Sequence, residues 1–320
     1  MQVKSAVNPP NARNKAVLGQ LSDMDLRLLK VFRSVVDCGG MAAAELELNI
    51  GTSTISRHVK DLETRLGLVL CRRGRAGFAL TADGQRVYDE TLRLMASVDA
   101  FRGSIDDIHQ RLGGTLELAL FDKTATNPAA RIGQAIALFT ERAPEVALSV
   151  HVGSINAIEQ GVLEGSYQVG IIPAHRASRS LVYADLFDET MLLYCGALHP
   201  LFDAETGKLT WAKLAEHRFA GLGYHSPNME LSHRARLARA ATGFDQEAIA
   251  TLILSGRYLG FLPDHYAQVF EQRGLMRAVL PKRFHYPCRF VSLLRRSPRP
   301  SRTVLAFQAC LDEAHRQMGG

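Results

Sequence analysis

The apolar positions of residues 49–67 predict an amphipathic helix with an unusual polar face. Ile55, Val59, Leu62 and Leu66 follow one another at spacings of 4, 3 and 4, which makes one buried stripe on a helix. The opposite face combines small hydroxyls and cations, with no carboxylate before Asp61. Surface helices usually mix both signs of charge. The residues expected on or beside this face are Thr52, Ser53, Thr54, Ser56, Arg57 and Lys60.

Two further helices are predicted upstream of this one. Ser22 is a good N-cap for the first, which should end at Gly39–Gly40. A short alanine-rich helix over 41–48 and a tight turn at 49–51 then lead into the amphipathic helix. Helix, short helix, glycine-containing turn and longer helix are the arrangement of a helix-turn-helix. The apolar stripe of the first helix should contain Leu26, Leu29, Phe32 and Val36.

A basic β-hairpin is predicted directly after the third helix. The apolar runs 68–71 and 78–80 flank a loop, 72–77, that contains Arg72, Arg73 and Arg75. A helix-turn-helix followed by such a hairpin is a winged helix-turn-helix. Residues 53–86 hold seven lysines and arginines against three acids, an excess of 7 − 3 = +4 within a chain whose net charge is +6.

Binding to double-stranded DNA would explain the polar face of this helix. Small threonine and serine side chains let a helix approach base edges in the major groove, and Arg57, Lys60 and the wing arginines would meet phosphates. The alternative is a solvated face on a helical hairpin, or a winged helix that binds protein. Agreement of the turn, the face and the wing favours DNA.

A heptad seam is predicted in the next helix, for which Thr81 is the expected N-cap. Its apolar positions repeat at spacings of 4 and 3 until Gly113–Gly114. The most economical partner for a narrow seam is the same helix of a second subunit. The alternative is packing against the chain's own C-terminal domain. Besides Thr91, the seam consists of Val87, Leu94, Val98, Phe101, Ile105, Ile108 and Leu112.

Strands alternate with helices from residue 114 to the end of the chain, which indicates a parallel α/β sheet. Strands are expected at 114–122, 146–153 and 167–173, with helices near 128–142, 156–164 and 301–317. In such sheets a ligand lies beyond the C-terminal ends of strands, near helix N-termini. For each candidate contact the alternative is a capped helix or an ordinary turn. The candidates are Lys123, Thr124, Thr126, Ser154, Asn156, Tyr224, His225 and Ser226.

Composition excludes several classes of protein. The 320 residues are 47% hydrophobic and 22% charged, with a pI near 9.2, which is typical of a globular protein with a mildly basic surface. No apolar run is long enough to span a membrane, and the N-terminal residues lack the apolar core of a signal peptide. The five cysteines are far apart, so free thiols in the cytoplasm are expected.

No catalytic, metal-binding or cofactor-binding motif is present. The chain lacks H-E-x-x-H, G-x-x-x-x-G-K-[ST], G-x-S-x-G and an EF-hand loop. His217, His225 and His233 are spaced too widely for a zinc pair, and the run 221–226 lacks the third glycine of a dinucleotide turn. We therefore predict neither an enzyme nor a cofactor.

Together these residues resemble the LysR-type transcriptional regulators. Three segments carry this resemblance: the first helix (24–40), Ile55-Ser56-Arg57 in the third helix, and a wing followed by Leu-Thr-x-x-Gly at 80–84. The resemblance is most specific over 24–84. The chain departs from the family where Gly51-Thr52-Ser53 replaces the usual Ser-Gln-Pro or Ser-Gln-Ser, so no operator sequence carries over, and where Cys71 replaces a Phe.

The resemblance implies a tail (1–20), a DNA-binding domain (21–84), a linker helix for dimerisation (85–113) and a two-lobed effector domain resembling periplasmic binding proteins (114–320). Lobe 1 would be 114–185 with 288–320, and lobe 2 would be 186–287. The resemblance also implies a small-molecule effector, for which an anionic metabolite is one option. It further implies a homodimer that pairs into a homotetramer, with RNA polymerase as a further partner. The alternative is an α/β solute-binding protein or enzyme whose N-terminal helices contact protein.

Overall fold

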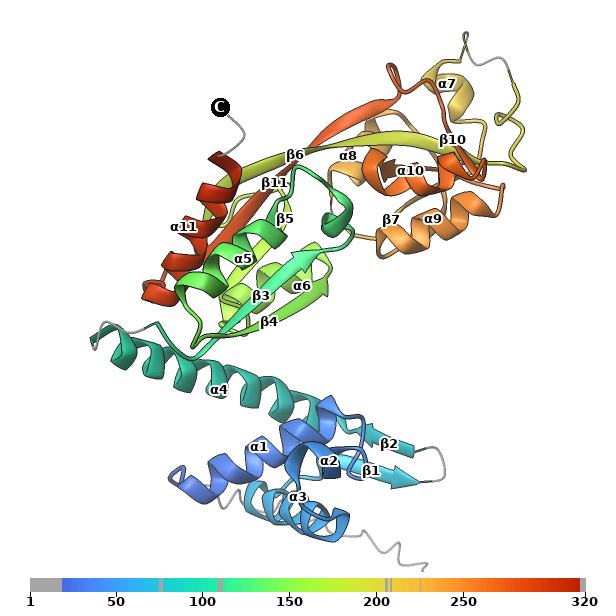
Figure 1. The fold of residues 1–320 in the computed structure, drawn as a ribbon. Coiled ribbons are helices and arrows are strands. Elements are labelled where there is room, and N and C mark those ends of the chain that lie inside the picture. The colour runs from blue at the N-terminus through green and yellow to red at the C-terminus, as the bar shows by residue number, and fades with distance from the viewer. Residues whose placement is uncertain are drawn as a thin grey trace, which may run out of the picture. The chain divides into compact units, whose positions relative to one another are not determined.

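The computed structural model describes residues 19–74, 77–108, 112–204, 207, 209–224 and 226–316. These residues form two compact units, one up to Ala96 and one from Ser97 onward (Figure 1). Within the described part, no helix has the length and apolar character needed to cross a bilayer.

The first unit begins with three helices, α1 (Asp23–Asp37), α2 (Ala44–Leu48) and α3 (Thr52–Leu66). The predicted N-cap is confirmed, because the hydroxyl of Ser22 accepts a hydrogen bond from the Asp25 backbone, and the Asp25 carboxylate accepts one from the Ser22 N–H. In α3 the predicted residues Ile55, Val59 and Leu62 are buried. The buried face of α1 is wider than predicted, since it comprises Leu28, Leu29, Val31, Phe32 and Val35.

The wing is the hairpin of β1 (Cys71–Gly74) and β2 (Gly77–Leu80). The predicted loop at 72–77 is too long, because Arg72, Arg73 and Gly74 belong to a strand. Cross-strand pairing continues to Gly74 opposite Gly77, which leaves only residues 75–76 between the strands. Ladder hydrogen bonds therefore extend further than the apolar pattern indicated.

The long helix α4 (Ala82–Ile108) follows, and Thr81 caps it as predicted by accepting a hydrogen bond from the Gly84 N–H at 2.8 Å. The first half of the helix packs on the winged unit: Thr91 and Met95 are buried, and Val87 and Leu94 are partly buried against the same core.

The second unit has one mixed sheet in the order β4-β3-β5-β11-β6-β9-β7-β8, with β10 (Met276–Ala278) added to β6. Pairing is parallel around β3 (Thr115–Phe121) and β7 (Phe219–Leu222). The prediction of a purely parallel sheet is wrong for the central strands. There the long strands β6 (Leu181–Gly196) and β11 (His285–Arg295) pair antiparallel with each other and with their neighbours.

These two long strands join two groups of elements, as Figure 1 shows. We call the groups lobe 1 and lobe 2. Lobe 1 holds β3, β4 (Ala147–Gly153), β5 (Val169–Pro173), the 3-10 turn η1 (Thr124–Thr126), α5 (Ile132–Arg142), α6 (Ile155–Glu164) and α11 (Arg302–Arg316). Lobe 2 holds β7, β8 (Arg239–Gly243), β9 (Leu259–Pro263), β10, α7 (Trp211–Leu214), α8 (Pro227–Arg234), α9 (Gln246–Leu254) and α10 (Asp264–Gln272).

One hydrophobic core runs through both lobes, because β6 and β11 are long enough to carry buried residues into each. Phe187 stacks on Phe290 at 4.7 Å between ring centroids on these two strands. Of the five cysteines, all free, Cys38 is partly exposed and the other four are buried.

Candidate nucleic-acid interface and ligand site

The polar face of α3 is exposed where a DNA contact requires it. Ser53, Arg57 and Lys60 are exposed, and Thr54 and Ser56 are half-buried beside the apolar stripe. The residues predicted for this face therefore share one surface of one helix. Arg72, at the start of the wing, is also exposed. The Arg73 side chain and all of Arg75 lie outside the described part of the chain.

Thr52 has a structural role that the sequence pattern did not reveal. Both its backbone N–H and its hydroxyl donate to the Glu45 carboxylate on α2. Gly51, the N-cap of α3, has no side chain to accept a hydrogen bond, so Glu45 supplies the missing acceptor from the preceding helix. This contact fixes α2 against the first turn of the helix that carries the polar face, and it lowers the pKa of Glu45.

Two buried or half-buried carboxylates hold the interface in place. Asp25 of α1 accepts hydrogen bonds from Arg65 of α3, and this guanidinium holds the pKa of Asp25 well below its usual range. Glu63 accepts hydrogen bonds from the backbone N–H groups of Leu70 (2.8 Å) and Cys71 (3.3 Å), where the wing begins. α1, α3 and β1 thus form one rigid frame behind the cationic face.

In the second unit, the loop after β3 bonds directly to lobe 2. Asp122 accepts a hydrogen bond at 2.6 Å from the backbone N–H of Gln246, the first residue of α9. Lys123 pairs with Glu247 and lies over the Tyr266 ring at 4.8 Å. The charge of Lys123 is therefore neutralised by lobe 2, although the sequence suggested it as a ligand contact.

Some of the predicted ligand contacts cap helices or turns. Ser154 caps α6 and Ser226 caps α8, each by accepting a backbone hydrogen bond at 3.4 Å. Thr124 is buried and donates to its own strand end, while Thr126 lies 2.8 Å from Nδ1 of His265. Asn156 is exposed, and His225 lies outside the described residues. Only part of the predicted set faces the boundary between the lobes.

Three buried polar atoms at this boundary have no hydrogen-bond partner within the described residues. They are Oδ1 of Asp122, Oε1 of Gln246 and the Tyr224 hydroxyl. Tyr224 packs edge-on against Phe121, the residue before Asp122, at 6.4 Å between ring centroids. Burial raises the pKa of Tyr224, and the Asp122 charge adds to this. Asp122 and Gln246 were missed by the sequence analysis, although Asp122 stands directly at the end of a predicted strand.

Asp122 makes the C-terminal unit sensitive to pH. Burial raises its pKa from 3.8 to about 6, so the folded protein holds a proton that the unfolded chain releases between about pH 4 and 6. Stability is lost as the pH rises through this window. Asp122→Asn keeps an oxygen for the Gln246 N–H and should add about 1 to 3 kcal/mol of stability near pH 7, with little gain near pH 4.

Calorimetric unfolding of the full-length protein at about pH 4.5 and 7.5 tests this, with the transition of the C-terminal unit followed. The matched control is Asp185→Asn on β6, which removes only an exposed ion pair with Arg289 at 3.5 Å. Such a pair contributes about 0.5 kcal/mol or less, so the control should shift that transition little and equally at both pH values. Equal stabilisation at both pH values would contradict the assignment.

In the described part of the chain, no group of three or more histidine, cysteine or acidic side chains is arranged to hold a metal ion. A winged helix-turn-helix with a cationic face, joined to a two-lobed α/β unit, defines the class of DNA-binding regulators with a ligand-binding domain. Family models match both parts: "Bacterial regulatory helix-turn-helix protein, lysR family" over residues 26–85 and "LysR substrate binding domain" over 109–316.

Individual relatives agree with these matches. The chain is 38% identical over 290 residues to the HTH-type transcriptional activator BauR of Pseudomonas aeruginosa, covering 91% of this chain and 95% of the relative. It is 31% identical over 201 residues to the probable regulator LrrA of Synechococcus elongatus, covering 63% of this chain and 66% of the relative.

Solved structures share the fold. The LysR-family regulator CbnR matches with a TM-score of 0.62 at 18% identity, covering 91% of this chain and 99% of CbnR. A structure of full-length CbnR with its target DNA matches with a TM-score of 0.61 at 20% identity, covering 90% and 99%. The chain belongs to the LysR family of bacterial transcriptional regulators. It is a DNA-binding protein with an effector-binding domain and is not an enzyme.

Proposed function

We propose that the protein binds a promoter operator in the cytoplasm through α3 and the wing, as a homodimer that pairs into a homotetramer. The observation that carries the DNA assignment is the exposed cationic and hydroxyl face of α3 on its rigid frame. We expect Ser53, Thr54 and Ser56 to lie in the major groove. Arg57, Lys60 and the wing arginines would contact phosphates. RNA polymerase is a further expected partner.

The second half of α4 supports self-association. Phe101 is 67% exposed and Ile105 39% exposed, although both lie on the predicted heptad seam. Exposed apolar side chains at heptad spacing on a long helix are typical of a coiled-coil contact. Val98 on the same seam is partly buried, and the side chain of Ile108 lies outside the described part of the chain. Leu112, beyond the end of α4, packs partly buried against the core of the second unit.

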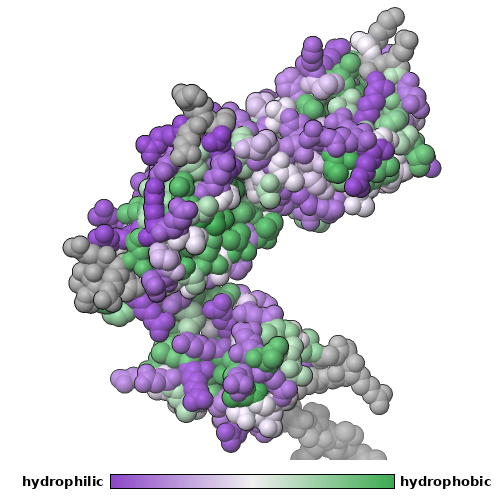
Figure 2. All heavy atoms as spheres, viewed as in Figure 1, coloured by the Kyte–Doolittle hydropathy of each residue, from purple (hydrophilic) through white to green (hydrophobic). Residues whose placement is uncertain are grey.

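A second apolar surface supports the larger assembly. Figure 2 shows hydrophobic residues over the part of the C-terminal unit that contains β3 and β4. On β4, an edge strand, Val150 is 48% and Val152 is 68% exposed. Edge strands with exposed apolar residues are prone to pair with another chain. Two separate contact surfaces on one subunit are what a tetramer built from dimers requires.

Removal of the α4 seam is expected to convert dimers to monomers. Phe101→Ser with Ile105→Ser removes two large apolar side chains from the proposed contact. The double variant should lower the association constant for dimerisation at least tenfold. Analytical ultracentrifugation of the full-length protein measures this. Arg102→Ala, on the same helix and 66% exposed at its side chain, is the control. An unchanged mass distribution in the double variant would refute the seam as an interface.

We further propose that an effector binds between the lobes and changes how far they close on each other. The change in closure would alter how the subunits pack together on DNA. The partnerless Asp122, Gln246 and Tyr224 atoms support this, because buried polar groups usually have partners. Relatedness to BauR, an activator, supports activation as the outcome.

Gel-shift titration against the chain's own upstream DNA, with competitor DNA and varied salt, tests the function. Sequence-selective binding with a salt slope is the expected result. Binding that is equal for unrelated duplexes would overturn it. A reporter fused to the same upstream region separates activation, which raises expression, from repression, which lowers it.

A further inference from the structure

A groove of about 590 Å³ lies within lobe 2, between α7 and the C-terminal end of α8. Its volume is in the range of small-molecule sites. Among the described residues, none from lobe 1 or from β6 lines it, so it is separate from the boundary between the lobes. The lining residues are Trp211, Ala212, Ala215, Leu231, Arg234, Ala235 and Arg236.

Most of this lining is apolar and is supported by the core behind it. The Trp211 ring packs edge-on against Phe284, at 4.7 Å between ring centroids, and Phe284 is fully buried. Leu231 is partly buried against the same core. The three alanines of the lining are too small to fill the space beside the indole. The groove therefore offers a preformed surface for an apolar group.

The two charged residues of the lining are both arginines. Arg234 and Arg236 are exposed, and neither forms an ion pair or a side-chain hydrogen bond with another described residue. Within the same part of the chain, no carboxylate lines the groove. Two guanidiniums at an apolar surface create a positive potential there, and guanidiniums bind carboxylates through paired hydrogen bonds.

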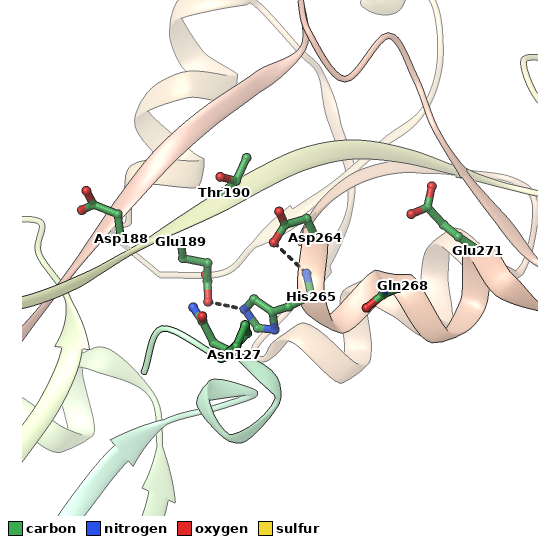
Figure 3. A pocket seen from close by; sticks show the side chains of 9 residues that line it. Asn127, Asp188, Glu189, Thr190, Asp264, His265, Gln268 and Glu271 are labelled. Carbon is green, nitrogen blue, oxygen red and sulfur yellow. Dashed lines mark hydrogen bonds and ion pairs between the residues drawn. The ribbon is translucent and has the colours of Figure 1, made fainter. Parts of the chain in front are cut away.

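The pocket at the boundary between the lobes has the opposite charge. Figure 3 shows that acidic side chains from β6 and α10 surround it, and its described lining contains no lysine or arginine. An anion would be repelled there, whereas the groove between α7 and α8 would attract it. The carboxylates of the boundary pocket are those of Asp188, Glu189, Asp264 and Glu271.

The backbone of Arg236 is a separate observation that points to a ligand. Arg236 directly follows Ala235, the C-cap of α8, and has a φ of 54°, in the left-handed region. Glycine is usual at this position because it has no Cβ to strain the backbone. A cation does stabilise the C-terminal end of a helix, but Arg234 in the last turn already supplies one. Residues held in such a conformation are typical of ligand-binding positions.

We propose that this groove binds a small organic anion with an apolar body, of the class of arylalkyl or branched-chain carboxylates. The apolar body lies against Trp211 and Leu231, and the carboxylate pairs with the guanidiniums of Arg234 and Arg236. This is a second ligand site, beyond the effector site proposed between the lobes, and it does not depend on that site.

Tryptophan fluorescence of the full-length protein, at low salt and without DNA, tests the proposal. Trp211 is the only tryptophan in the chain, so the emission reports on the surroundings of this residue. The probes are sodium phenylacetate, phenylacetamide, phenethylammonium chloride and sodium acetate. Phenylacetate should change the emission saturably below about 10 mM. The neutral amide should bind at least tenfold more weakly, and the amine and acetate should give no saturable change, because one lacks the negative charge and the other the apolar body.

Substitution of the two arginines separates binding from folding. Arg234→Gln with Arg236→Gly should weaken phenylacetate binding at least tenfold, and the variant should fold because both side chains are exposed. The matched control, Arg257→Gln with Arg273→Gln, removes the same charge from exposed positions of lobe 2 outside the groove and should change the affinity less than twofold. Arg236→Gly alone should weaken binding and yet raise the melting temperature by about 1 to 3 °C, because glycine relieves the left-handed strain.

Three results would overturn this assignment: no saturable change up to about 10 mM phenylacetate, equal binding of the amide, or unchanged affinity in the double variant, which would place the anion elsewhere in the protein. Emission that varies with protein concentration but not with phenylacetate would instead identify the groove as a contact between copies of the chain, and would also overturn it. None of these results affects the DNA-binding function, which the gel-shift measures independently.

Discussion

Arg57→Ala combined with Arg72→Ala should weaken binding to the operator duplex at least a hundredfold at low salt. Arg57 lies on the exposed face of α3 and Arg72 at the exposed start of the wing. Each substitution removes a phosphate or base interaction worth about 1 to 3 kcal/mol, and the salt slope should fall by about one for each phosphate that the variant no longer neutralises. Gel-shift titration over a range of salt concentrations gives both quantities.

The control is Arg93→Ala, on α4 of the same unit, where the side chain is 44% exposed and pairs with Glu90. It should change affinity less than twofold, since α4 does not carry the cationic face. If the double variant keeps full affinity and the same salt slope, the face of α3 is not the DNA contact.

Gly84→Ala should unfold or severely destabilise the DNA-binding unit. A Cβ at this position would lie 1.9 Å from the backbone oxygen of Leu70. This oxygen already accepts a hydrogen bond from the Thr81 N–H, and Gly84 itself donates to the Thr81 hydroxyl. The first turn of α4 thus lies directly against the chain entering the wing, and relief requires a backbone shift. We expect a loss of about 3 kcal/mol or more.

A matched substitution lies in the same helix. Gly103→Ala would bring its Cβ only to an ordinary contact, 3.7 Å from Cβ of Ser301. It should be neutral or stabilise slightly, because alanine favours a helix by about 1 kcal/mol over glycine. Thermal unfolding followed by circular dichroism compares the two variants. Similar melting temperatures would show that Gly84 is not needed for close packing.

Local patterns were sufficient for the DNA-binding unit. The helix of residues 52–66, its buried stripe, the cap at Ser22 and the cap at Thr81 follow from short-range rules, since each depends on neighbours within four residues. The basic hairpin was also predictable, though not its length. Its strands continue through Arg72 and Arg73 because backbone pairing does not require apolar side chains.

Other features depend on residues that are far apart in sequence. The Glu45 cap on Thr52 was invisible to periodicity, because a carboxylate from another helix replaces the missing N-cap side chain. The buried face of α1 is wider than predicted, because the helix contributes to two clusters: Val31 and Val35 belong to one, and Leu28 belongs to the other. The spacing of apolar residues along one helix does not predict how many neighbouring elements that helix packs against.

The sequence therefore determined the order of helices and strands, the caps and the cationic face, because these follow from the spacing of side chains along one segment. The tertiary structure alone decided the antiparallel pairing of β6 with β11 and the hydrogen bond from Gln246 to Asp122. Asp122 and Gln246 are 124 residues apart. Their contact arises because two long strands bring separate lobes together, and no local preference encodes that meeting.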